Sequence, residues 1–166
     1  EATAFWAAHK PAPVTLPALA LDVTELVDIE AVTPEPAAGE SLRDKIKLAV
    51  QAFGGKAAQY SVLARTKGVP IKKAFAIPVF WYHKFMTDNG LFAQVDKLLA
   101  DAVFVSDSAV RDAKLATLRA AMMQAPIDQA LQDALKAKIA KDYANGKMRF
   151  RTSTNSEDLE GFPCAG

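Results

Sequence analysis

The sequence predicts an α+β fold in which helices dominate and a few short strands occur. Apolar residues recur every three or four positions over much of the chain after residue 40, which is typical of helices with one packed face. Apolar, β-branched stretches of strand length are few and short. The chain has 166 residues, of which 51% are hydrophobic, so it can build one ordinary core but not two large ones.

Residues 1–40 are expected to form a Pro/Ala-rich arm or linker. They hold five of the nine prolines, and proline removes a backbone donor and restricts its neighbours, which excludes a long regular helix. We expect an extended segment with one short strand in LALDVTEL, residues 19–26, and a linker that ends near Gly39. Residues 41–166 would then form the domain proper.

The domain is expected to begin with two helices separated by a glycine pair. Ser41 can cap the first helix, SLRDKIKLAVQAF, and Gly54-Gly55 would end it. The second helix would cover residues 56–67, with Gly68 as its stop. A strand is expected around residues 75–77, followed by a short helix through WYHKFMTDN that ends before Gly90.

Three further helices are expected in the second half of the chain. They are LFAQVDKLLADAVF, SDSAVRDAKLATLRAAMM and PIDQALQDALKAKIAKDYA, each with apolar residues on one face. The following KMRFRT, residues 147–152, reads as a short strand that delivers Arg149 and Arg151 to one face at its end.

Composition limits the kinds of partner. The chain has 20 Lys and Arg against 19 Asp and Glu, so its net charge of +1 gives no general reason to expect nucleic acid or an anionic membrane surface. No stretch approaches the roughly 20 apolar residues of a membrane span. The single Cys164 excludes an internal disulfide, and a reducing, cytoplasmic setting fits best. Recognition of phosphate would therefore depend on a local group of residues and not on the net charge of the chain.

The first phosphate-compatible segment is FGGKAAQYSVLARTKGV. Gly54 and Gly55 would let backbone N–H groups approach an anion, the new helix offers its positive end, and Lys56 adds a charge. It is not a Walker A loop, because Val50 and Ala57 stand where that motif needs a glycine and a hydroxyl residue. Taken alone, the motif is equally a glycine break with a solvated lysine.

The second such segment is RFRTSTNSEDLEGFPCAG, residues 149–166. Two arginines suit phosphate oxygens, and Thr154 to Glu157 match a capping box. Glu157 and Asp158 could contact a nucleotide-borne metal, since Mg²⁺ takes one or two protein carboxylates plus phosphate oxygens. Alternatively, the segment is a capped helix start in which the arginines pair with these acids.

Together and in this order, the two segments resemble the nucleotide-binding domain of the phosphoenolpyruvate synthase and pyruvate phosphate dikinase family. There a GGK turn leads into a helix and an aromatic-rich segment, similar to GGKAAQYSVLARTKGVPIKKAFAIPVFWYHKF. About a hundred residues later an Arg-Ser-Ser strand end precedes an E-D-L-x-G segment, and RTSTNSEDLEGFPCAG is similar to it. The resemblance covers roughly residues 45–166.

The resemblance implies a fold like the first part of an ATP-grasp domain, with ATP and Mg²⁺ as cofactors. Lys56 and Arg151 fall at the family's ATP phosphate contacts and would be the catalytic residues. Gly54 and Gly55 match the turn, while Ser153, Glu157 and Asp158 fall in the segment that lines the phosphate end of the cleft. The metal ligands would lie outside this chain.

The family's reaction passes a phosphoryl group from ATP to a histidine on a separate domain and then to pyruvate. The partners implied are therefore ATP and the phosphohistidine and acceptor domains of a longer parent chain. The chain lacks an initiating Met and ends at Gly166 straight after a polar segment, so we expect a piece of a dikinase that is inactive alone.

Two alternatives stay open at this level. A related dikinase could use a glucan or a small molecule as acceptor. A non-catalytic helical binding module is the other, favoured by a departure from the family pattern in which Ile71, Lys72, Lys73 and Ala74 replace its proline and glycine. Thr152, Ser153 and Thr154 in place of the common Ser-Ser-Ala keep the hydroxyl chemistry.

Overall fold

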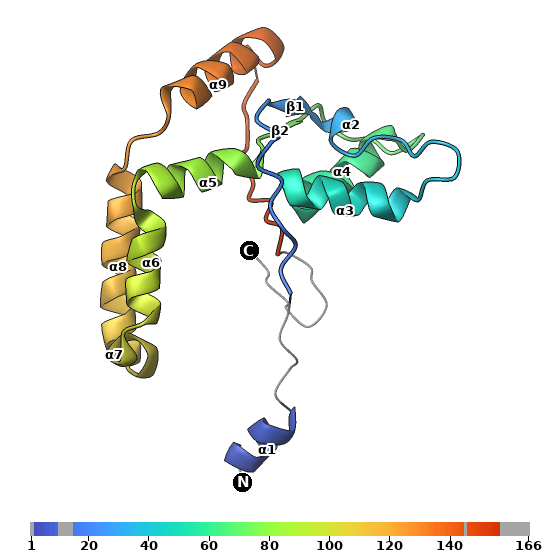
Figure 1. The fold of residues 1–166 in the computed structure, drawn as a ribbon. Coiled ribbons are helices and arrows are strands. Elements are labelled where there is room, and N and C mark those ends of the chain that lie inside the picture. Colours follow the sequence, from blue (N-terminus) through green and yellow to red (C-terminus); the bar gives the residue numbers. More distant parts are fainter. Residues whose placement is uncertain (1, 10–14, 145, 157–166) are drawn as a thin grey trace. The chain divides into compact units, whose positions relative to one another are not determined.

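The computed structural model describes residues 2–9, 15–144 and 146–156, and over these ranges the chain is helix-rich with one small sheet, which confirms the predicted α+β class. The chain divides into two compact units (Figure 1). Unit 1 comprises Glu1–Phe80 and Arg149–Gly166, and unit 2 comprises Trp81–Met148. Within the described ranges, no helix is both long and apolar enough to cross a membrane.

Unit 1 contains a two-stranded antiparallel sheet and three packed helices. Strand β1 (Val27–Asp28) pairs with β2 (Phe75–Ala76), in the register Val27 to Ala76 and Asp28 to Phe75. Helix α2 (Ile29–Val32) follows β1 directly, and both α2 and α3 (Leu42–Phe53) pack on α4 (Gly55–Arg65). Helix α1 (Ala2–His9) precedes them in the chain.

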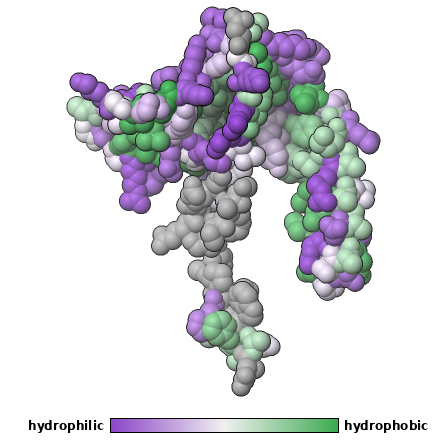
Figure 2. Space-filling model, turned by 180° about the vertical axis from the view of Figure 1, so that it is seen from behind, coloured by the Kyte–Doolittle hydropathy of each residue, from purple (hydrophilic) through white to green (hydrophobic). Residues whose placement is uncertain are grey.

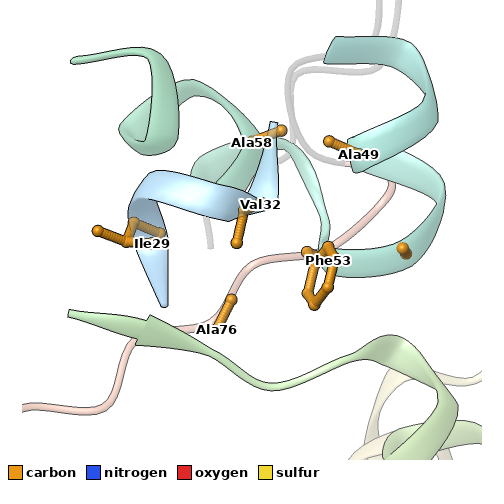
Figure 3. Packing of buried hydrophobic residues seen from close by; sticks show 7 residues of the cluster. Ile29, Val32, Ala49, Phe53, Ala58 and Ala76 are labelled. Carbon is orange, nitrogen blue, oxygen red and sulfur yellow. The ribbon is translucent and has the colours of Figure 1, made fainter. Parts of the chain in front are cut away.

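The core of unit 1 is made of small and branched side chains, which lets the helices approach closely (Figure 3). Its largest member is Phe53 at the end of α3, and Ile29 and Val32 enter from α2. Burying each such large side chain contributes about 1.5–3 kcal/mol. Four alanines complete it, namely Ala49, Ala52, Ala58 and Ala76. Residues of the predicted arm therefore supply part of this core, while the domain boundary at residue 40 stays a prediction.

A buried polar cluster holds α2 against α4. Thr33 is fully buried; its N–H donates to Ser61 Oγ at 2.9 Å and its hydroxyl donates to the Ala58 carbonyl at 2.8 Å. The guanidinium of Arg65 donates to the carbonyls of Glu30, at 2.8 Å, and Thr33. These bonds satisfy backbone groups at the end of a four-residue helix, which cannot satisfy them internally.

Unit 2 consists, in its described residues, of helices joined by turns and loops. Helix α5 (Val79–Asp88) leads into it from unit 1, and α6 (Leu91–Leu99), α7 (Ala102–Ser106), α8 (Ser108–Gln124) and α9 (Gln129–Asp142) follow. Helices α6 and α8 lie side by side, with α7 at the end that joins them (Figure 1). Helices α7, α8 and α9 are capped by the side chains of Asp101, Asp107 and Asp128, respectively. Each of these carboxylates accepts hydrogen bonds from two backbone N–H groups in the first turn of its helix.

The surface of unit 2 mixes apolar and polar side chains. Helices α8 and α9 bury none of their described residues fully, and Leu99, Val103, Val105 and Met123 are exposed. Figure 2 shows green and purple residues intermingled over the α6–α8 hairpin. The helices have the apolar faces that the sequence predicts, but residues on these faces, such as Leu118 and Leu131, are only half-buried.

Four local predictions are wrong. The segment expected to be extended in residues 1–40 contains two helices, α1 and α2. The strand expected in residues 19–26 is absent, and β1 is a two-residue strand just beyond it, because only Val27 and Asp28 have a partner strand. The helix expected over residues 91–104 breaks between α6 and α7, where Asp101 caps a new helix. Residues 147–152 form neither strand nor helix, since their contacts go to a helix junction instead of a neighbouring strand.

Candidate functional site

The glycine turn between α3 and α4 is built by two helix ends that meet. Gly54 has φ 82° and ψ 166°, a backbone conformation that is essentially restricted to glycine. Its N–H donates to the Val50 carbonyl and closes α3, while its carbonyl accepts from Ala58 N–H and opens α4. Lys56 therefore sits in the first turn of α4, on a junction whose direction is fixed by hydrogen bonds on both sides.

Residues 152–154 dock on this turn, although about a hundred residues of chain separate them. Ser153 Oγ accepts the Ala57 N–H at 2.9 Å and donates to the Phe53 carbonyl at 2.8 Å, so one hydroxyl bridges α4 and α3. The Thr154 carbonyl accepts the Gly55 N–H at 2.9 Å. We call residues 152–154 the docked tripeptide.

The docking requires the glycine at position 54. A Cβ on Gly54 would lie 2.3 Å from the carbonyl oxygen and 2.4 Å from the carbonyl carbon of Ser153. Atoms of real side chains do not approach that closely, and the obstacle is backbone that cannot rotate away. The turn therefore admits the tripeptide only because Gly54 has no side chain, and Gly54 and Gly55 are both buried beneath it.

The docking gathers the predicted cations. Lys56 Nζ donates to the Thr152 carbonyl at 3.1 Å, which places the ammonium beside the residue that follows Arg151. Lys56, Arg149 and Arg151 are all exposed. The two segments that the sequence marked as phosphate-compatible thus meet at the α3–α4 junction. A Lys and an Arg are the side chains suited to a phosphate group, and their role in binding one stays a prediction.

The backbone N–H groups of the turn donate to protein oxygens and not, as predicted, to an anion. The sequence favoured backbone N–H groups at the start of α4 as anion ligands, but the Gly55 and Ala57 N–H groups bond to Thr154 and Ser153. Two protein oxygens, the Thr154 carbonyl and the Ser153 hydroxyl, lie at the helix start where phosphate oxygens were expected. Side chains, rather than this helix end, remain as the candidate ligands.

The predicted carboxylates Glu157 and Asp158 lie outside the described residues, as does the second half of the predicted capping box. Thr154, which begins that stretch, has no regular structure, and Asn155 and Ser156 form a turn. Among the described residues, no group of three or more His, Cys, Asp or Glu side chains is placed to hold a metal ion. The nucleotide-binding roles of Gly54, Gly55 and Ser153 stay predictions.

Two contacts that complete the site were missed from the sequence. Asn155 Nδ2 donates to the Pro17 carbonyl at 2.9 Å, and the Ala20 N–H donates to the Gln51 carbonyl at 3.0 Å in the last turn of α3. Residues 17–20, which we call the N-terminal strap, therefore contact both α3 and Asn155, the residue that follows the docked tripeptide. Backbone carbonyls carry no residue-type signal, so only the asparagine offered a clue.

One comparison with known proteins gives a family match. The family model described as pyruvate phosphate dikinase, AMP/ATP-binding domain, matches residues 50–166, which is more than half of the chain and includes both segments of the site. The N-terminal strap lies before the match. No curated protein and no solved structure matches the chain.

Proposed function

Because the chain belongs to the pyruvate phosphate dikinase AMP/ATP-binding domain family, we propose that it binds ATP for phosphoryl transfer, with Lys56 and Arg151 on the phosphates. In the proposed reaction the γ- or β-phosphoryl group passes to a histidine on another domain and from there to pyruvate. This chain supplies the nucleotide site, and the other domains supply the histidine and the acceptor. We further propose that the protein acts in the cytoplasm.

The observation that carries the proposal is the docking of residues 152–154 on the glycine turn. Lys56 Nζ lies 3.1 Å from the Thr152 carbonyl, so the lysine contacts the residue that follows Arg151. The lysine-bearing turn and the arginine-bearing segment are therefore linked through backbone contacts of the chain. This supports an anion site shared between two segments.

The roles of the two cations follow from the chemistry of phosphoryl transfer. The transferred group passes through a state with charge spread over its oxygens, so catalysis depends on positioning and on offsetting that charge. Lys56 would act as a point charge, whereas the fork of Arg151 can hold two oxygens and fix the orientation of the phosphate. A nucleotide-bound Mg²⁺ would add charge at the β- and γ-oxygens.

The test is ATP binding by the full chain, measured by calorimetry, with charge-matched controls. We expect Lys56→Ala and Arg151→Ala each to weaken binding about tenfold or more, because hydrogen bonds to charged groups contribute about 1.5–3 kcal/mol. Lys136→Ala and Arg119→Ala remove equal charges from the exposed surface of α9 and α8 and should leave the affinity unchanged. Equal affinities in all four variants would refute the assignment.

The second candidate function is a binding module without catalysis. The exposed apolar side chains of unit 2, such as Leu99 and Val103, favour it, because such residues can pack against a partner. It differs from the first proposal in one measurable respect: ATP would not protect Lys56 from chemical labelling of amines.

A further inference from the structure

We propose that the N-terminal strap, residues 17–20, contributes to the affinity of the phosphate site by holding the arginine-bearing segment in place. Asn155 is the positioning residue that connects the strap to this segment. The inference rests on the proposed function, since it concerns the affinity of that same site. It extends the site to residues that precede the matched family domain, which begins at residue 50.

Consecutive residues of the second segment are held by separate contacts. The Thr152 carbonyl accepts from Lys56, the Ser153 hydroxyl bridges the two helix ends, and the Thr154 carbonyl accepts from Gly55. All of these contacts reach the α3–α4 junction. Asn155 is the next residue, and its side chain instead donates to the Pro17 carbonyl at 2.9 Å.

The strap itself is anchored to α3. The Ala20 N–H donates to the Gln51 carbonyl at 3.0 Å, so the strap is fixed to the last turn of α3. Pro17, Ala20 and Asn155 are each at least partly buried. Because α3 ends at the same glycine turn that receives the docked tripeptide, the strap and the turn hold the second segment from two sides.

The consequence concerns Arg151. Residues 147–154 have no strand or helix hydrogen bonds to fix their course, so their position depends on the contacts of residues 152–155. Loss of the Asn155 contact removes the attachment of the segment to the strap, while its bonds at the glycine turn remain. The arginine then samples more orientations, and ATP binding must restrict them at a cost in affinity.

The experiment compares two asparagines that make the same kind of bond. Asn89 Nδ2 donates to the Pro126 carbonyl at 3.2 Å within unit 2, so Asn89→Ala is the matched control for Asn155→Ala. In the full chain, we expect Asn155→Ala to raise the Kd for ATP about two- to tenfold, the equivalent of one neutral hydrogen bond. Asn89→Ala should leave the Kd unchanged even if both variants unfold at similarly lowered temperatures.

A truncation tests whether the strap is the partner. Removing residues 1–21 deletes Pro17 and Ala20, and in that chain Asn155→Ala should have no further effect on the Kd. An equal effect of Asn155→Ala with and without the strap would overturn the proposal. The point variant alone keeps the test valid if the shortened chain does not fold.

A nucleotide-free measurement separates this inference from the proposed function. Hydrogen exchange of the Gly55 amide, which bonds to Thr154, should speed up in Asn155→Ala and not in Asn89→Ala. Faster exchange in a chain that does not bind ATP would refute the proposed function, but it would support the positioning of the second segment by the strap. Unchanged exchange together with an unchanged Kd would refute that positioning role.

Discussion

Gly54→Ala is the sharpest perturbation of the site, because it adds one methyl group at the point where the two segments meet. The added Cβ would lie 2.3 Å from the carbonyl oxygen of Ser153. Since this is backbone, the docked tripeptide must move as a whole. Alanine must also adopt φ 82° and ψ 166°, a conformation in which side chains are strained.

The expected loss of stability has two parts. The backbone conformation costs about 1–3 kcal/mol for a residue with a side chain. Undocking then removes three hydrogen bonds, namely Gly55 to Thr154, Ala57 to Ser153 and Ser153 to Phe53, each with a net contribution of about 0.5–1.5 kcal/mol. Without counting the exposed bond from Lys56 to the Thr152 carbonyl, we expect a loss of roughly 3–7 kcal/mol, which is a large share of the stability of an ordinary domain, about 5–15 kcal/mol.

Gly68→Ala separates the two parts. Gly68 also has a positive φ, 84°, but a Cβ there would meet no atom within 4 Å. It therefore carries the backbone penalty without the collision. Equilibrium urea unfolding of both variants, with amide exchange of Ala57 as a local probe, should show Gly54→Ala less stable by at least about 1.5 kcal/mol, the minimum for three bonds. The docking would be refuted if both variants lost the same free energy of unfolding and the Ala57 amide of Gly54→Ala stayed protected from exchange.

Three further predictions concern the groups around the site and unit 2. Ser153→Ala, which deletes the hydroxyl that bridges two helix ends, should lower the free energy of unfolding by about 1–3 kcal/mol in urea titrations, and a loss below 0.5 kcal/mol would contradict that bridge. Arg65→Met should cost about 2–4 kcal/mol in the same assay, because it strands the buried carbonyl of Thr33; a neutral result would mean that water replaces the guanidinium. The Lys114 ammonium, followed by the backbone N–H groups that Asp101 caps, lowers the pKa of Asp101 below its ordinary 3.8. Its contribution to stability is therefore present above that pH and is lost as the pH falls below it, and Asp101→Asn should flatten this part of a pH titration of the unfolding midpoint.

The helices were predictable because their signals are local. Ser41 precedes α3 as expected, although its side chain makes no capping bond, and Gly54, Gly68 and Gly90 all have positive φ at the predicted breaks. The strands failed for the opposite reason. A strand exists only where a partner lies beside it, and the partner of β1 is about fifty residues away. Apolar content in residues 19–26 could not reveal that Val27 and Asp28 alone would pair.

The sequence pointed to the two segments that meet in the structure, but not to how they meet. Residue types and the family pattern predicted Lys56 and Arg151 as phosphate ligands, and these roles stay predictions. The use of the glycine turn was not foreseeable, because the same pair of glycines that lets an anion approach also lets a peptide approach. Which of the two occupies the turn depends on Ser153, whose hydroxyl fits between two helix ends.

This arrangement links the stability of the chain to its proposed chemistry. If the start of α4 bound phosphate directly, Lys56 and the turn would suffice, and the second segment would add only affinity. In the structure the turn is filled by the docked tripeptide, so the proposed phosphate binding would rely on side chains of the two docked segments. A substitution that prevents docking, such as Gly54→Ala, should therefore abolish ATP binding although it leaves Lys56 and Arg151 in the sequence. Retained ATP affinity in an undocked variant would mean that the phosphates bind at the turn, where the oxygens of residues 153 and 154 now lie.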